Sequence, residues 1–433
     1  MMEPARVQEV LRRIDRDEVC RLAVELANID SPSGREMPVG DFVFEWLRRE
    51  GFAPRKLALD EDGPFNVMGL LPGTGGGTSL LFNSHLDTVL AREDLWLDPD
   101  AGNPIHHSSW QEGDRVFGMG IVNDKGPMAC WMVACKAIKD SGLRLKGDLL
   151  LTMVCCEIGF EPVDEFRGAE LPTKDRGARF AAVHGAVADY ALVAEGTSFG
   201  VAWVEAGKAF CKVTLDGGGT SYYTPHYPAR TTLDASPNAI VQMARLIPAL
   251  EEWAKTYEVR HRYECPGGTV IPKVNIGAIR GGIPTKIIRC PQQCAIYLDI
   301  RITPRQHPLD VRQELQELLA ATGVKGTVEV FLYRPGTEGK GVEPLVEALG
   351  RAHEVEFGRK LEKAAPPHSS MWRDINVFNE LRIPAVTYGP AASAGGGVYS
   401  MLGEDLHRAA RIYAATAMNL CSRDRPRGQG VAI

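Results

Sequence analysis

Residues able to bind a metal or move a proton follow four apolar segments of the chain. They are His85 and Asp87 in the segment 84–88, Asn123 and Asp124 in 120–126, Glu157 after Cys156, and Glu195 after Ala194. In an α/β sheet, ligands bind at the edge formed by the C-terminal ends of the strands. Hard or borderline divalent cations favour histidine, carboxylate and amide ligands. Four such segments in succession therefore predict a divalent-cation site.

Each of these segments also has a structural explanation. Alternation along a strand puts His85 and Asp87 on the same face, so one can bind a metal while the other orients it. Asn123 lies in a turn that enters an apolar helix, where an Asn or Asp also serves as a cap. Glu157 and Glu195 end apolar strands, and a carboxylate buried there is functional or paired, because an unpaired one is costly. Each signal is weak alone, and only their combination favours the functional interpretation.

The segments before these residues predict a mostly parallel sheet covered by helices. Strand-like apolar runs occupy residues 65–71, 79–89, 148–157 and 188–195. The run TSLLFN, bounded by the turn GTGGG, is typical of a strand buried on both faces. Helical spacing covers residues 5–28 and 36–50, and an apolar helix runs from Gly126 to Gly142. Buried strands that alternate with helices indicate an α/β domain.

A different pattern begins near Gly207 and predicts an inserted domain. Looser strand-like segments and long amphipathic helices follow one another in the order strand–helix–strand–strand–helix–strand. This is the order of a ferredoxin-like α+β layer. After Gly336 the α/β pattern resumes with the apolar run PAVTYGP. We therefore expect a larger α/β domain of residues 1–205 and 335–433, and an inserted ferredoxin-like α+β domain of residues 206–334.

The composition disfavours several classes of protein. The 433 residues include 49 basic and 55 acidic side chains, a net charge of −6, which argues against nucleic-acid and membrane binding. No run approaches the roughly 18 apolar residues of a membrane span, and the charged N-terminus lacks the apolar centre of a signal peptide. The ten cysteines do not form a disulfide framework. These features predict a cytoplasmic protein.

Five motifs resemble those of the M20 family of aminopeptidases and deacylases. They are HLDTV, GMGIVNDKGP, CEIG, DYALVAEGTS and IPAVTYGP, and the resemblance extends over nearly the whole chain. It implies a metal-dependent hydrolase of C–N bonds in which His85 and Glu195 hold one metal. It also implies that the larger domain is the metal-binding catalytic domain and that the inserted domain, residues 206–334, is a lid that mediates subunit contacts, so a homo-oligomer, a dimer or higher, is expected.

The chain departs from the family's motifs at positions that carry charge or bind metal. Asn123 stands where the family has an aspartate that bridges two metals, and Cys156 stands where it has the catalytic glutamate. The stretch 394–399 lacks the family's last histidine. The resemblance with these departures implies that only one set of metal ligands survives.

We therefore expect one divalent transition metal per chain, manganese or zinc, held by His85, Asn123 and Glu195. Whether Asn123 or its neighbour Asp124 contacts the metal stays open. Glu157, released from its family role as a ligand of the second metal, is expected to act as the general base, because hydrolysis needs a base close to the attacking water. Asp87 is the second residue expected to take part in catalysis.

Four lid residues are expected to contact the substrate. Tyr222, Tyr223 and His226 lie near the position from which a histidine of the family reaches the active site of a partner subunit. Aromatic side chains suit a flat substrate, although a tyrosine in a loop is more often part of the packing. Arg289 is a candidate for binding a substrate carboxylate, and surface exposure is an equally compatible interpretation.

The leading hypothesis is cleavage of a C–N bond in a small carboxylate-bearing substrate by metal-activated water. The altered site also suits deamination of an activated aromatic amine, as in the conversion of 5-nitroanthranilate to 5-nitrosalicylate. One alternative is an M20 peptidase or acyl-amino-acid deacylase with altered ligands, and another is a catalytically inactive binding protein of the same fold. A thiolate mechanism at Cys156 is disfavoured, because apolar neighbours raise a thiol pKa.

Overall fold

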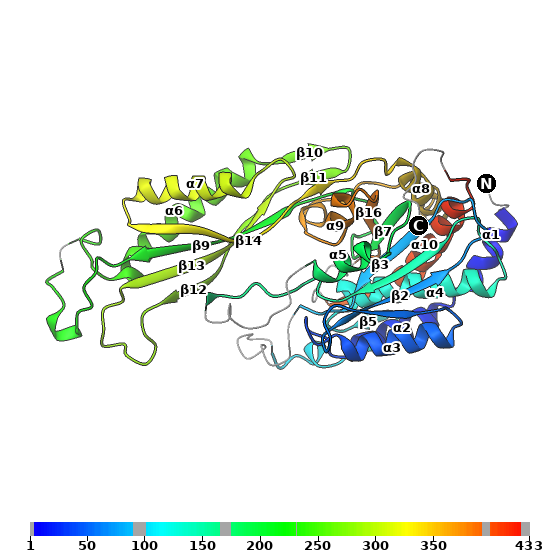
Figure 1. Cartoon of the computed structure of the whole chain (residues 1–433), viewed down its shortest axis with the longest axis horizontal. Helices are drawn as coiled ribbons and strands as arrows, with labels where there is room; N and C mark the ends of the chain where they lie inside the picture. The colour runs from blue at the N-terminus through cyan, green and yellow to red at the C-terminus, as the bar shows by residue number, and fades with distance from the viewer. Residues whose placement is uncertain (1–3, 90–100, 165–174, 231, 392–398, 426–433) are drawn as a thin grey trace.

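A six-stranded sheet forms the centre of the larger domain in the computed structural model, which describes residues 4–89, 101–164, 175–230, 232–391 and 399–425 (Figure 1). Its strands are β1 (Arg55–Ala58), β2 (Phe65–Leu71), β3 (Leu80–His85), β6 (Leu149–Val154), β7 (Tyr190–Ala194) and β16 (Ala385–Tyr388). The order is β1-β2-β6-β3-β7-β16, in which the last four strands are parallel and β1 and β2 pair antiparallel. The mostly parallel sheet expected from the sequence is confirmed.

Helices cover both faces of this sheet, which explains why its parallel strands are almost entirely apolar. One face packs in the largest hydrophobic core against α2 (Arg16–Asn28), α3 (Met37–Arg49), α4 (Gly126–Asp140), α8 (Glu343–Phe357) and α10 (Gly403–Cys421). The other face packs against α5 (Arg176–Val183) and α9 (Ile375–Glu380). Along β3, Leu80 and Phe82 belong to the first core and Leu81 to the second, the alternation expected of a strand.

The N-terminal helical region differs from the single stretch expected over residues 5–28. It forms α1 (Pro4–Leu11) and then α2. Asp15 has an extended backbone, and its side chain accepts the N–H groups of Asp17 and Glu18, so it caps α2 and starts a new helix. The helices expected at 36–50 and from Gly126 are α3 and α4, with ends that differ by at most two residues.

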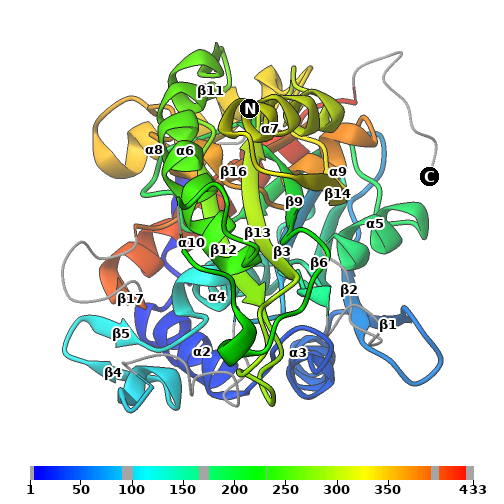
Figure 2. The same ribbon diagram turned by 90° about the vertical axis from the view of Figure 1, so that its left-hand side faces the viewer.

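The lid is a four-stranded antiparallel sheet with two helices on one face. In chain order it contains β9 (Gly207–Asp216), α6 (Ala239–Arg260), β12 (Val274–Gly281), β13 (Gln293–Ile302), α7 (Pro308–Thr322) and β14 (Gly326–Arg334). The strand order β12-β13-β9-β14 confirms the ferredoxin-like layer. α6 and α7 pack on this sheet around a core of their own. The lid extends away from the larger domain (Figure 1), and in the view along the long axis it lies in front of that domain (Figure 2).

Among the described residues, three small sheets of short strands accompany the two large ones. β8 (Val204–Glu205) pairs with β15 (Thr337–Glu338) where the chain enters and leaves the lid. The hairpin of β10 (Tyr263–Cys265) and β11 (Gly268–Val270) was not anticipated from the sequence. A third small sheet contains β4 (Trp110–Glu112), β5 (Arg115–Phe117) and β17 (Ser400–Leu402). Among the described helices, none is long and apolar enough to cross a membrane.

Candidate metal site

His85 is the last residue of β3, and its imidazole is buried at the C-terminal edge of the sheet. Its Nδ1 lies 2.9 Å from the backbone oxygen of Asp87 and 3.3 Å from the Oδ1 of that residue. A proton on Nδ1 satisfies both oxygens and leaves Nε2 to bind a metal. Burial lowers the pKa of His85, but the hydrogen bond with Asp87 and the charge of Glu157 outweigh it and raise that pKa well above its ordinary value. The site is therefore strongly attractive to a cation.

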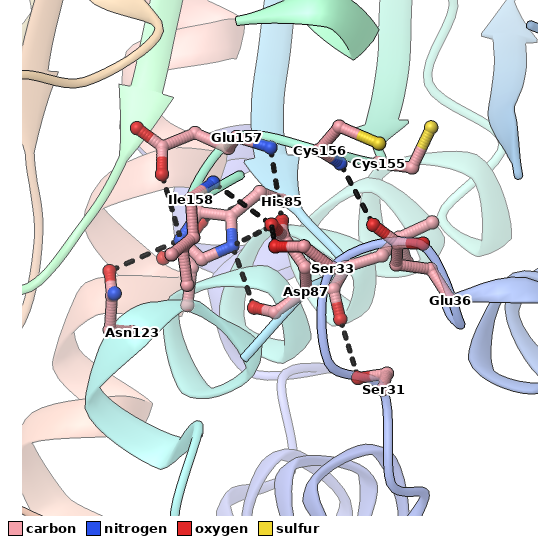
Figure 3. Close-up of polar contacts among 12 residues, drawn as sticks. Ser31, Ser33, Glu36, His85, Asp87, Asn123, Cys155, Cys156, Glu157 and Ile158 are labelled. Atoms are coloured by element: carbon pink, nitrogen blue, oxygen red, sulfur yellow. Dashed lines mark hydrogen bonds and ion pairs between the residues drawn. The ribbon is translucent and has the colours of Figure 1, made fainter. Parts of the chain in front are cut away.

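Asp87 is fully buried and is held from several directions. Its carboxylate accepts the backbone N–H groups of Glu157 at 3.1 Å and Ile158 at 2.9 Å, and the hydroxyl of Ser33 at 2.6 Å (Figure 3). These bonds tie the end of β6 to the end of β3. Asp87 is thus placed to orient the imidazole of His85, the division of work that the His–x–Asp spacing predicts.

Asn123 comes from the turn Ile121–Lys125 that precedes α4, and its backbone leaves the helical conformation there. Its Oδ1 lies 3.1 Å from Nε2 of His85 (Figure 3). Ligand atoms that each lie about 2.0–2.2 Å from one ion are about 3 Å apart when they occupy adjacent coordination positions. The separation of Asn123 from His85 therefore fits two ligands of one ion.

Two buried carboxylates complete the group around His85. The ligand atoms of His85, Asp124 and Glu195 all lie within 4.8 Å of one another. Oδ2 of Asp124 accepts the backbone N–H of His85 at 3.2 Å, while its Oδ1 is buried with no hydrogen-bond partner in the described parts of the chain. Burial and the charge of Glu195 raise the pKa of Asp124 well above its ordinary value. An orphaned oxygen among like charges is what a cation would satisfy, so the group fits a divalent ion.

Glu157 follows the end of β6 and points to the same side of His85 as Asn123 does (Figure 3). Its Oε2 lies 4.0 Å from Nε2 of His85, and its side chain is buried. The carboxylate is therefore close enough to act on a molecule bound beside that nitrogen.

The thiol of Cys156 points away from the carboxylate of Glu157 (Figure 3). Cys156 has a φ of 56°, in the left-handed region, and its backbone N–H donates to Oε1 of Glu36 at 3.0 Å. The hydrogen bond from Cys155 lowers the pKa of the Cys156 thiol. Burial and the charges of Glu36 and Asp87 raise this pKa by more than that, so the net shift is upward. This is unfavourable for a thiolate nucleophile.

A buried arginine beside Glu195 was missed by the analysis of the sequence. Arg373 lies in the turn before α9, with its Nε 3.3 Å from Oε2 of Glu195. Its Nη1 donates to Oε1 of Glu205 at 2.6 Å. The only signal in the sequence is one arginine next to Trp372, and its carboxylate partners, Glu205 and Glu195, are 168 and more residues away.

The four lid residues expected to bind substrate lie together, but not at His85. The guanidinium of Arg289 lies 4.9 Å from the ring centroid of Tyr223, and the N–H of Cys290 donates to the carbonyl of Tyr222 at 2.7 Å. His226 belongs to the short helical turn Thr224–His226 of the same loop. This loop, which precedes α6, lies at the end of the lid farthest from β3 (Figure 1). Within one chain the structure therefore does not bring these residues to the metal site, and their role stays a prediction that requires a second subunit.

Comparison with known proteins agrees with this architecture. The family model described as peptidase family M20/M25/M40 matches residues 81–419. The chain is 25% identical over 412 residues to the N-formyl-4-amino-5-aminomethyl-2-methylpyrimidine deformylase of Bacillus subtilis, with 87% of each protein covered. It is 26% identical over 374 residues to the succinyl-diaminopimelate desuccinylase of Corynebacterium glutamicum, covering 85% of this chain and 87% of that protein.

The fold is shared with solved structures at low sequence identity. The YXEP protein of Bacillus subtilis, a dinuclear metal-binding peptidase, superposes with a TM-score of 0.61 at 14% identity. The superposition covers 94% of this chain and 98% of that one. At this identity the likeness concerns the fold alone.

Proposed function

Because the chain belongs to the peptidase family M20/M25/M40, a family of metal-dependent hydrolases of C–N bonds, we propose that it cleaves such a bond in a small carboxylate-bearing substrate with a single divalent ion per chain. The observation that carries this proposal is the buried group of His85, Asp124 and Glu195, joined by the amide oxygen of Asn123. The ligands we propose for the ion, manganese or zinc, are His85, Asn123 and Glu195. Asp124, whose Oδ2 is already engaged by a backbone N–H, adds negative charge beside them.

The ion, when bound, supplies a Lewis acid that lowers the pKa of water and polarises the bond to be cleaved. Glu157 accepts the proton of the attacking water and passes it to the departing nitrogen. Asp87 keeps Nδ1 of His85 protonated and so keeps Nε2 directed at the ion. The buried position of these groups excludes bulk water, which strengthens each electrostatic interaction.

The proposed substrate class is an N-acyl compound that carries a carboxylate. Two relatives are named for removing acyl groups, a formyl group in one and a succinyl group in the other. A second candidate, hydrolytic deamination of an activated aromatic amine such as 5-nitroanthranilate, is favoured by a different observation. The resemblance of the motifs implies that Asn123 and Cys156 replace the carboxylates that the family's two-metal amide hydrolysis uses, so the site is altered where a peptidase would be expected to keep it.

A purely binding function is opposed by the charges buried at the site. His85, Asp87, Asp124, Glu157 and Glu195 are all less than 5% exposed, and such burial is costly unless the charges are used or paired. Loss of catalysis would remove the need to keep them together.

The subunit arrangement is part of the proposal. We place a subunit interface in the lid, residues 206–334, so that Tyr222, Tyr223, His226 and Arg289 of one subunit meet the substrate in another. Light scattering should then show a dimer or a larger oligomer. A strictly monomeric protein that turns over substrate would remove these four residues from the site.

The test is a turnover screen with chelator-stripped protein reloaded with manganese or zinc. The panel contains an N-formyl amine, an N-succinyl amino acid, a dipeptide and 5-nitroanthranilate, with Glu157→Gln as the inactive control. Metal-dependent release of a carboxylic acid from an N-acyl substrate supports the first candidate. Release of ammonia from the aromatic amine supports the second. Failure of all four with metal correctly bound would favour the binding protein.

A further inference from the structure

Arg373 is a buried cation placed directly beside the candidate ligand Glu195. The residue is 5% exposed, and its partner Glu205 in β8 is fully buried. Nη1 of Arg373 donates to Oε1 of Glu205 at 2.6 Å and to the carbonyl of His368 at 2.8 Å. Its Nε lies 3.3 Å from Oε2 of Glu195. An arginine stays charged in such surroundings, because its pKa is far above neutrality.

The two oxygens of Glu195 face different partners. Oε1 lies 3.8 Å from Nε2 of His85, whereas Oε2 lies on the side of the guanidinium. The carboxylate is therefore divided between the candidate ion site and a permanent positive charge. Glu157 also contributes to the negative potential at Arg373. Three buried acidic residues thus act on one buried guanidinium.

Arg373 is poorly placed to bind a substrate carboxylate. Its Nε and Nη1 are engaged by Glu195, Glu205 and the carbonyl of His368, and very little of the side chain reaches the surface. Replacing those buried carboxylates by a substrate would leave them without a partner, which is costly.

We propose that Arg373 is a positioning residue that takes the place of a second cation. It holds Oε2 of Glu195 and the carboxylate of Glu205, and so leaves Glu195 with one oxygen for an ion on the side of His85. This restricts the site to one ion. The inference rests on the proposed function, since it takes the group around His85 to be a metal site.

The test is the number of ions bound by the full-length protein after chelator treatment and titration with Mn²⁺. Wild-type protein should bind about one ion per chain, and Arg373→Lys should also stay at one, because the charge remains. Arg373→Met removes the charge at similar size and frees Glu195 and Glu205 to hold another cation. It should bind about two ions per chain, and the electron paramagnetic resonance spectrum should show two coupled Mn²⁺ ions. The second ion should be lost again in the double variant Arg373→Met/Glu205→Gln.

One ion in both wild type and Arg373→Met would overturn this inference and leave the proposed function standing. No ion, or two ions, in the wild type would overturn both. Circular dichroism shows whether Arg373→Met folds. If it does not, Glu205→Gln decides, because it leaves the guanidinium with one carboxylate fewer and more positive charge beside the ion. Its affinity for Mn²⁺ should fall by at least about tenfold, and an unchanged affinity would contradict the inference.

Discussion

The half of the site around His85 and the half around Arg373 both contain buried carboxylates, but the negative charge of these carboxylates is balanced differently in the two halves. In the first half, Asn123, Asp124, Glu157 and Glu195 gather near one imidazole nitrogen, and one oxygen of Asp124 has no hydrogen-bond partner in the described chain. In the second half, a guanidinium engages Glu195 and Glu205. The first half therefore fits a bound metal ion, whereas in the second half the guanidinium of Arg373 is already the positive charge.

Under our proposal of a single ion, this difference means that one metal ion and one arginine together balance a cluster of buried carboxylates. Negative charge that is buried must be balanced, and either a metal ion or an arginine can do so. A metal ion also offers open coordination positions, whereas an arginine whose donors are engaged offers none. Only the half around His85 is then able to act on a substrate.

The largest effect is expected from removing the imidazole of the first half. His85→Ala takes away the nitrogen on which the other ligand atoms converge, so ion and turnover should be lost together. Ion affinity should fall by more than about a hundredfold, beyond what is typical of residues that only orient a ligand. The matched control is His107→Ala, since His107 is exposed. Elemental analysis and a turnover assay on the same samples check this, and retention of the ion in His85→Ala would break the comparison.

The next largest effect is expected at Glu157, and it distinguishes the proposed general base from the proposed metal ligands. Glu157→Gln keeps the shape of the side chain and removes its ability to accept a proton, so turnover should fall by about a hundredfold or more. Ion content should barely change. Cys156→Ala is the matched control and should cost far less. Should Cys156→Ala abolish turnover while Glu157→Gln leaves it intact, a thiolate route would replace this mechanism.

A smaller effect is expected at the residue that orients the imidazole. Asp87→Asn keeps the size of Asp87 but weakens its hold on Nδ1 of His85, so ion affinity should fall by about ten- to a hundredfold. Ser33→Ala removes only one hydroxyl donor to Asp87 and should cost less. Competition with a metal-binding dye measures both. An unchanged ion affinity in Asp87→Asn would mean that Asp87 does not act through His85.

The smallest effect is expected on the stability of the fold, at a histidine that lies outside both halves of the site. His353 in α8 is buried against the hydroxyl of Tyr388, at 2.8 Å from Nδ1, and burial lowers the pKa of this histidine to about 4. In the unfolded chain the pKa is about 6.5. The unfolded state therefore binds the proton first, and stability present above pH 6.5 is lost as pH falls toward 4. Between pH 6.5 and pH 5 the loss should be about 1 to 2 kcal/mol.

The variant His353→Gln isolates that contribution. It should be less stable than wild type at pH 7 but should lose less stability on acidification, as measured by urea unfolding at each pH. Equal pH slopes in the two proteins would show that His353 does not titrate as its burial implies.

The first half of the site could be predicted because each of its residues stands next to a recognisable pattern in the sequence. His85, Glu157 and Glu195 each end or follow a run of apolar residues, and the parallel sheet then brings those ends together. The period of the apolar residues also predicts the helices and the ferredoxin-like lid. It does not predict the break between α1 and α2, because the cap at Asp15 interrupts an otherwise helical pattern.

The second half could not be predicted in this way. Arg373 comes from a turn before a short helix, and Glu205 comes from a two-residue strand that enters the lid. Their pairing depends on how the chain returns from the lid to the sheet, which no local pattern records. Likewise, the sequence leaves open the choice between Asn123 and Asp124, and the structure brings both side chains to His85.

The most direct test of the account is the metal content of the purified wild-type protein. Elemental analysis of protein saturated with manganese or zinc and then dialysed should give about one divalent ion per chain, readily removed by a chelator. Two tightly held ions per chain would contradict it, because Arg373 would then not take the place of a second cation.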